Sequence, residues 1–140
     1  MDRSAKITKD RDCALMEGLD DRALEEVAEF FRAFSVPLRL KILNALRAGE
    51  HNVGELTELV ACSQANVSKH LALLAQSGLI ARSVRGTSTY YRIVDPRIFQ
   101  LCDIVCGQIG QRLSGQSDLY RTFTGGASTA RKPSRRTARR

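Results

Sequence analysis

Apolar residues recur along most of this chain at the three- and four-residue spacing of amphipathic helices, and in one region they form two short runs instead. The two runs, at 79–84 and 88–94, are rich in Ile, Val, Thr and Tyr and are separated by Arg85-Gly86-Thr87. They predict a β-hairpin with a glycine turn in a chain that is otherwise mainly α. Helices are predicted over about residues 20–34, 35–49, 53–60, 63–78 and 95–113.

The third and fourth predicted helices are separated only by Ala61-Cys62-Ser63. Two short helices joined by a three-residue turn form a helix-turn-helix, in which the second helix reads DNA. Ser63 is suited to cap that second helix, and Gly78 is suited to end it. The hairpin that follows directly is the wing of a winged helix. The sequence therefore predicts a winged helix-turn-helix domain.

Several motifs within this arrangement resemble a known family. They are FSVPLRLKIL at 34–43, VGEL at 53–56, NVSKHL at 66–71, Leu74, GLI at 78–80, Gly86 and Tyr91-Arg92. In this order they resemble the ArsR/SmtB family of bacterial metalloregulatory repressors. The resemblance implies a dimer, formed through N-terminal and C-terminal helices, that leaves DNA when a metal, metalloid or oxidant reaches its cysteines or other ligands.

The length of 140 residues suits one domain that pairs with a second copy of itself. We expect a mobile, charged arm at 1–18, a DNA-binding and dimerisation domain at 19–114, and a disordered basic tail at 115–140, where Gly, Ser and Thr accumulate without periodicity. No apolar run approaches the roughly 18 residues of a membrane span, and the polar start is unlike a secretory signal. We therefore expect a cytoplasmic protein, associated with the nucleoid, without a membrane partner.

The formal charge of +7 is unevenly distributed. Six of the 22 basic residues lie in 131–140, where there is no acidic residue. Residues 1–60 carry nine basic and twelve acidic side chains, whereas 61–124 carry seven basic and three acidic. The positive part of the body is thus the part that holds the second helix of the helix-turn-helix and the wing, as contact with DNA phosphates requires.

The polar residues of that second helix are the candidates for contact with operator DNA, which a dimer would bind as an inverted repeat. Gln and Asn can pair with adenine, and Ser and Lys suit phosphates or guanine. At the wing, a basic residue and its neighbour could reach the minor groove or its phosphates. The alternative is that these side chains are merely solvated, and for His70 that it lies against the wing or a phosphate. The candidates are Gln64, Asn66, Ser68, Lys69, His70, Arg85 and Thr87.

Two metal sites known in the family are missing from this sequence. The Glu-Leu-Cys-Val-Cys-Asp-Leu signature of the resembling repressors corresponds to residues 50–56, where Asn52 and Gly54 replace both thiolates. The zinc site of the family's last helix needs histidines, but no histidine follows His70, although Asp103 is present. Sensing through either of these sites is therefore not expected.

The predicted last helix offers Cys102 and Cys106 instead, four residues apart and hence one turn apart on the same face. Thiolates favour soft acceptors, so we expect As(III) or Sb(III) as inducer, with Cd(II) or another soft metal less favoured. Cys13 could supply a third ligand. Two alternatives remain open: a packing role for the pair, and oxidation or reactive-sulfur chemistry at the same cysteines. Cys62, in the turn, is interpreted as a packing residue.

Other classes of function receive less support. The sequence contains no glycine-rich phosphate loop, H-E-x-x-H motif or nucleophile elbow, so we do not expect an enzyme. Nor do we expect an obligatory cofactor. A sequence-independent nucleic-acid binder that depends on the basic tail is the remaining rival.

Overall fold

The computed structural model describes residues 15–115 and 117–123. The predicted arm up to residue 14, with Cys13, and the tail from residue 124 lie outside the described residues. The chain divides into two compact units, Met1–Asp95 and Pro96–Arg140. The boundary between the two units falls inside the segment 19–114, which was predicted to be one domain.

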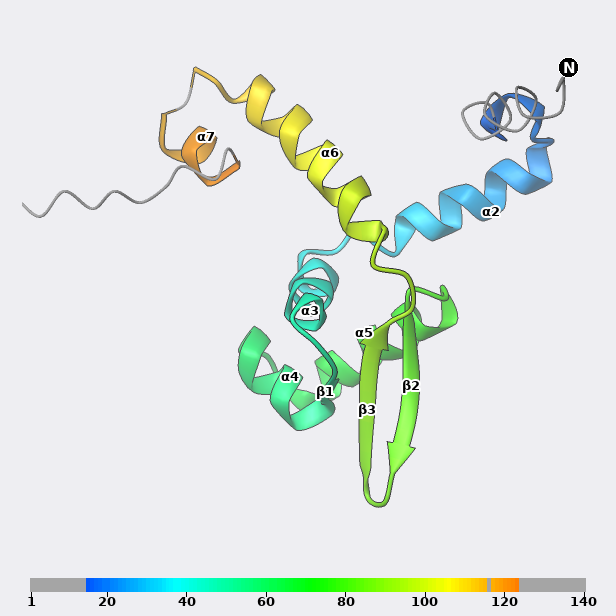
Figure 1. The fold of residues 1–140 in the computed structure, drawn as a ribbon, viewed down its shortest axis with the longest axis vertical. Coiled ribbons are helices and arrows are strands. Elements are labelled where there is room, and N and C mark those ends of the chain that lie inside the picture. The colour runs from blue at the N-terminus through cyan, green and yellow to red at the C-terminus, as the bar shows by residue number, and fades with distance from the viewer. Residues whose placement is uncertain (1–14, 116, 124–140) are drawn as a thin grey trace, which may run out of the picture. The chain divides into compact units, whose positions relative to one another are not determined.

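The first unit is a winged helix-turn-helix, and the mainly α fold class is confirmed (Figure 1). Asp20 caps the helix α2, because its Oδ1 accepts from the backbone N of Ala23 at 2.8 Å. Pro37 stands at the first turn of α3, where its missing N–H costs no hydrogen bond. The elements in chain order are a 3-10 turn at Leu15–Gly18, α2 at Asp21–Arg32, α3 at Pro37–Arg47, β1 at His51–Asn52, α4 at Val53–Val60, α5 at Gln64–Gln76, β2 at Ile80–Arg85 and β3 at Ser88–Ile93.

The strands β2 and β3 form the predicted wing, antiparallel and paired from Ile80↔Ile93 to Arg85↔Ser88. The turn between them contains Gly86, whose φ of 60° lies in the left-handed region that glycine tolerates. A third strand, β1, was not predicted, because two residues give no alternating pattern to read. It pairs antiparallel with β3, so that the strand order is β1-β3-β2.

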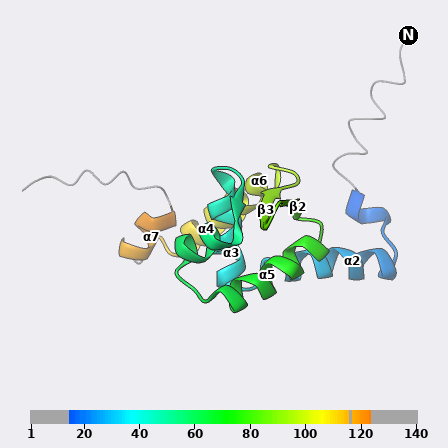
Figure 2. The same ribbon diagram turned by 90° about the horizontal axis from the view of Figure 1, so that it is seen from below.

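The core of this unit lies between α3, α4, α5 and the beginning of the wing. Figure 2 shows α5 along the lower edge of the unit, with α3 and α4 above it in that view. The largest fully buried side chains come from α3, α4, α5 and the residue just before β2, so that burial of these apolar side chains fixes α5 against the rest. They are Ile42, Leu43, Leu56, Val67, Leu71, Leu74 and Leu79.

The second unit contains α6, Ile98–Arg112, and α7, Ser117–Phe123, which contact each other. The helix α6 matches the predicted last helix, but α7 lies within the segment 115–140 that was expected to be disordered. The sequence pattern of α7 is weak, because the helix has only about two turns and Gly, Ser and Thr flank it on both sides. None of the helices within 15–115 and 117–123 is long and apolar enough to cross a membrane.

Candidate nucleic-acid interface and sensor cysteines

The helix α5 has one buried face and one exposed polar face. Val67, Leu71 and Leu74 have no exposed surface, because they pack into the core. The side chains predicted to touch DNA lie elsewhere on the helix, and four of the five are exposed. These four are Gln64, Asn66, Ser68 and Lys69.

The turn before α5 positions the first residues of the helix. Ala61 ends α4 with a φ of 52°, and the Oγ of Ser63 accepts from the backbone N of Asn66 at 3.3 Å, as the predicted N-cap. The side-chain amide of Asn66 donates to the Sγ of Cys62 at 3.2 Å. Cys62 is half-buried. Through this hydrogen bond it positions Asn66, a predicted base-reading residue, which is a role that the interpretation of Cys62 as a packing residue did not include.

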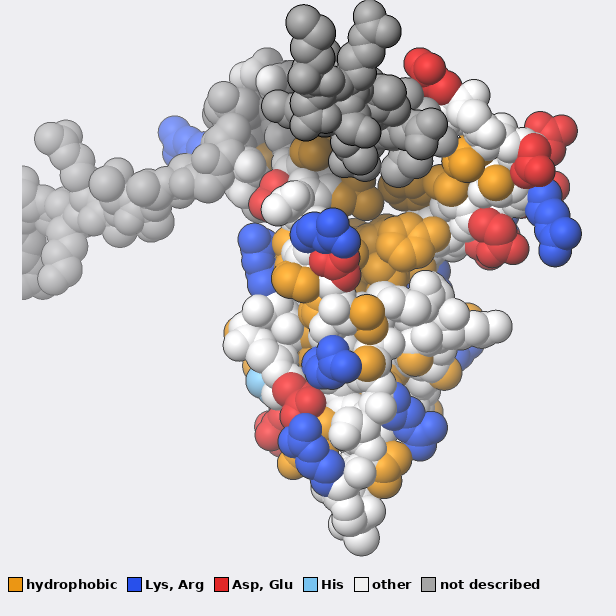
Figure 3. Space-filling model, turned by 45° about the vertical axis from the view of Figure 1, so that its right-hand side comes forward, with side chains coloured by type: hydrophobic (Ala, Val, Ile, Leu, Met, Phe, Trp, Pro, Cys, Tyr) orange, Lys and Arg blue, Asp and Glu red, His pale blue; other side chains and the backbone are white. Residues whose placement is uncertain are grey.

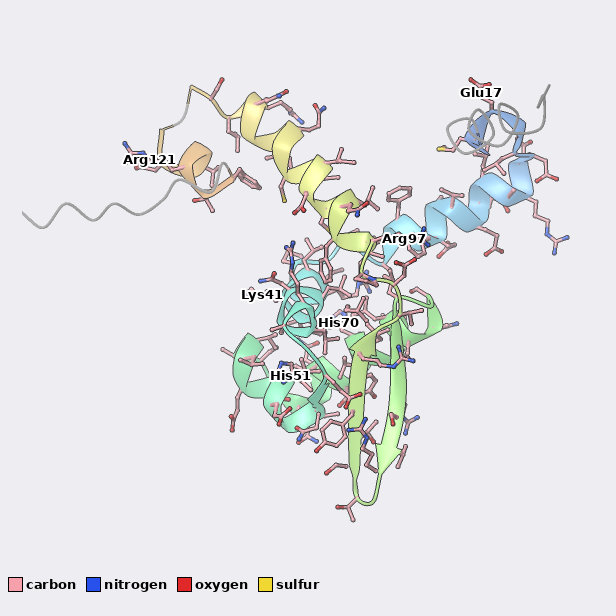
Figure 4. All side chains as sticks on the ribbon, in the orientation of Figure 1. Glu17, Lys41, His51, His70, Arg97 and Arg121 are labelled. Carbon is pink, nitrogen blue, oxygen red and sulfur yellow. The ribbon has the colours of Figure 1, made fainter. Side chains whose placement is uncertain are left out.

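His70 differs from the other four candidates on α5, because it is half-buried and its Nδ1 is shielded without a hydrogen-bond partner (Figure 4). Burial lowers the pKa of His70, and the positive charges of Arg39 and Lys69 lower it further. Arg39 itself is buried on α3, where its Nη2 donates to the carbonyl oxygen of Arg32 at 2.9 Å. The imidazole therefore faces protein at Nδ1 and is neutral near pH 7.

Both predicted wing residues, Arg85 and Thr87, are exposed. The Nη1 of Arg85 lies 2.7 Å from the Oε1 of Glu50, and its guanidinium stacks over the ring of Tyr90, 4.8 Å from the centroid. Basic side chains colour the lower part of Figure 3, where the wing lies, and acidic ones lie among them. Sequence reasoning missed Glu50, because its approach to Arg85 depends on the unpredicted strand β1.

The beginning of α4 corresponds to the missing thiolate signature, and here it is a capping box. The Oδ1 of Asn52 accepts from the backbone N of Glu55 at 2.9 Å, and the backbone N of Asn52 donates to the Oε2 of Glu55 at 3.0 Å. That hydrogen bond, followed by one from His51, lowers the pKa of Glu55. The side chain of Asn52 thus serves the helix rather than an ion.

The two cysteines of α6 lie one turn apart, with Cys102 half-buried and Cys106 exposed. Among residues 15–115 and 117–123, no group of three or more His, Cys, Asp or Glu side chains could hold a metal. Two thiols one turn apart suit a soft ion rather than a hard one. Cys13, the predicted third ligand, lies outside the described residues.

The comparisons with known proteins agree with this fold. The family model described as "Bacterial regulatory protein, arsR family" matches residues 36–82, which run from the beginning of α3 into the wing. The HTH-type transcriptional regulator NmtR of Mycobacterium tuberculosis is 36% identical over 85 residues, which cover 61% of this chain and 71% of NmtR.

Two solved structures show the same fold. The homodimeric winged helix-turn-helix DNA-binding domain of Mb0332 from Mycobacterium bovis has a TM-score of 0.58 and 31% identity, covering 66% of this chain and 92% of that one. The AntR antimony-specific transcriptional repressor has a TM-score of 0.59 and 26% identity, covering 71% and 93%. Regulators of this kind bind DNA and are not enzymes. The chain therefore belongs to the ArsR family of winged helix-turn-helix transcriptional repressors.

Proposed function

We propose that this chain is a homodimeric, sequence-specific repressor that leaves its operator when a thiophilic metalloid or soft metal binds Cys102 and Cys106. Arsenite and antimonite are the favoured inducers. The observation that carries the sensing part is the cysteine pair one turn apart on α6, with one thiol exposed to an incoming ion.

DNA binding is supported by the two faces of α5. The core holds the apolar face rigidly, and the polar face presents the amide, hydroxyl and ammonium groups of Gln64, Asn66, Ser68 and Lys69. Such groups can read base edges in the major groove, while the wing residues Arg85 and Thr87 reach the backbone or the minor groove. His70 is half-buried with its Nδ1 shielded, so it is a weaker candidate for direct contact.

Dimerisation is supported by apolar side chains that the single chain leaves exposed. The helix α2 has no buried residue and exposes Leu24 and Phe31, and α6 exposes Ile104 and Val105. Exposed apolar faces of this kind mark surfaces for a partner, and the related Mb0332 domain is a homodimer. Two recognition helices related by a two-fold axis require an inverted repeat with half-sites about one DNA turn, or a multiple, apart. Such a repressor would act in the cytoplasm, at the nucleoid.

The ligand assignment rests on the chemistry of the donors. Thiolates bind soft acceptors in preference to hard, oxygen-seeking ions, so As(III), Sb(III) and then Cd(II) fit better than Mg²⁺ or Ca²⁺. A trivalent metalloid takes three ligands well, and Cys13 of either subunit is the candidate for the third. The antimony-specific AntR is a structural neighbour with this kind of inducer.

Release follows from a shift between two dimer states. An ion on α6 would stabilise a dimer in which the two α5 helices no longer match successive major grooves. Coupling is reciprocal, so DNA must weaken the binding of the ion by the same factor as the ion weakens the binding of DNA.

The test is fluorescence anisotropy of the reduced protein on its promoter DNA, titrated separately with arsenite, antimonite, Cd(II), Zn(II), peroxide and polysulfide. Arsenite or antimonite should release the wild type, and excess dithiol should reverse the release. The double variant Cys102→Ser/Cys106→Ser should bind DNA normally and ignore the inducer, whereas Gln108→Ser, an exposed change on the same helix, should respond like the wild type.

Other results would contradict parts of the proposal. Release by peroxide or polysulfide alone would assign the same cysteines to redox or reactive-sulfur sensing. Loss of DNA binding by a folded double-serine variant would show that the pair has a packing role. Binding that ignores sequence and disappears when residues 125–140 are removed would make the protein a nonspecific binder.

A further inference from the structure

Arg85, the arginine of the wing, already contacts two side chains of its own subunit. The Nη1 of Arg85 lies 2.7 Å from the Oε1 of Glu50, which precedes β1 and is 35 positions away in the sequence. The guanidinium carbon of Arg85 also lies over the ring of Tyr90 of β3, 4.8 Å from the ring centroid. An anion and an aromatic ring thus hold the cation against the sheet.

The carboxylate of Glu50 pairs with the same guanidinium that would bind a DNA phosphate. The Arg85 side chain is 56% exposed and the Glu50 side chain 26% exposed, so that the ion pair stands at the surface but its acidic half is the more enclosed. A phosphate that binds this guanidinium must either displace Glu50 or lie beside it. Displacement costs the ion pair, and a shared guanidinium brings two anions close together, which repel.

We infer that Glu50 is an intramolecular competitor of DNA, which weakens the contact of the wing arginine with the phosphate backbone. This inference rests on the wing contact of the proposed function. The proposed function names residues that increase the affinity for DNA, and Glu50 is a residue that reduces it. Because the competing groups are surface charges, the effect is modest, about threefold in affinity, and salt screens it.

A double-mutant cycle tests the inference. The full chain and the variants Glu50→Gln, Arg85→Ala and the double variant are titrated on promoter DNA and on unrelated duplex DNA at low and high salt. Glu50→Gln should bind both DNAs about threefold more tightly at low salt, and the gain should shrink at high salt. In the Arg85→Ala background the same substitution should give no more than the small general gain expected from losing one negative charge, because the group over which carboxylate and phosphate compete is gone.

A control separates competition from the loss of one negative charge. Glu58 lies exposed on α4, so Glu58→Gln removes an equal charge away from this ion pair. It should change affinity by the same small amount with and without Arg85. Thermal unfolding of each variant checks that the fold is intact.

The outcomes distinguish the inference from the function on which it rests. Equal gains from Glu50→Gln with and without Arg85 would overturn the inference and leave a general charge effect. Weaker binding by Glu50→Gln would mean that the carboxylate positions Arg85 for DNA, which is the opposite role. Full affinity in Arg85→Ala would overturn the wing contact itself, and the role of Glu50 with it.

Discussion

Replacing Asn52 by alanine should destabilise the first helix of the helix-turn-helix by about 1 kcal/mol, the usual cost of losing an N-cap. The substitution removes the acceptor for the backbone N of Glu55, a hydrogen bond of 2.9 Å, and leaves half of the capping box. For a domain of the size of residues 15–95, 1 kcal/mol lowers the melting temperature by about 4–8 °C. The helix α4 carries the fully buried Leu56, so its fraying would be transmitted to the core beneath α5.

The assay is thermal unfolding followed by circular dichroism at one protein concentration, because dimerisation makes the melting temperature depend on concentration. The matched control is Asn52→Ser, which retains a side-chain oxygen for Glu55 in a capping box of the same kind. Hydrogen exchange should show faster opening of α4 in the alanine variant. Equal melting temperatures for the alanine variant and the wild type, or an equal loss in both variants, would refute the reasoning.

Three further predictions concern α5 and its ends. Gly78→Ala should cost about 1 kcal/mol in a urea titration, because φ is 77° and no atom lies within 4 Å of the added methyl group, so that strain acts alone. The lowered pKa of His70 means that the folded chain binds this proton less tightly than the unfolded chain. Stability should therefore be complete above the ordinary pKa of about 6.5 and fall below it, and His70→Gln should flatten that decline in melts between pH 8 and pH 5. Cys62→Ala should reduce the preference for operator over mismatched DNA by about threefold in anisotropy titrations, whereas Cys62→Ser should retain an acceptor for Asn66.

The sequence predicted the elements whose residues repeat within one helix or one hairpin. The spacing of Val67, Leu71 and Leu74 correctly predicted the buried face of α5, and Ser63 correctly predicted its beginning. The predicted turn of the wing at Gly86 is also confirmed. Each of these signals is local, because helical and strand periodicity are properties of a few consecutive residues.

Features that depend on distant residues could not be predicted in this way. The ion pair between Glu50 and Arg85 needs the pairing of β1 with β3, and β1 is too short to show a pattern. The lowered pKa of His70 depends in part on α3, which brings the positive charge of Arg39 near it. The contact of Asn66 with Cys62 requires the geometry of the turn, since spacing alone does not show which way the amide points. The cysteine pair of α6 was visible in the sequence, but its ion remains a proposal.

The distribution of buried residues also bears on how such proteins diversify. Among residues 15–115 and 117–123, the buried hydrophobic side chains lie between Ala33 and Tyr91, and Gly110 is the one buried residue of α6. The winged helix-turn-helix unit thus has a hydrophobic core built from its own residues. If Cys102 and Cys106 sense the inducer as proposed, substitutions at these two positions would leave the hydrophobic core of the DNA-binding unit unchanged, so that one such unit could be combined with sites for different inducers.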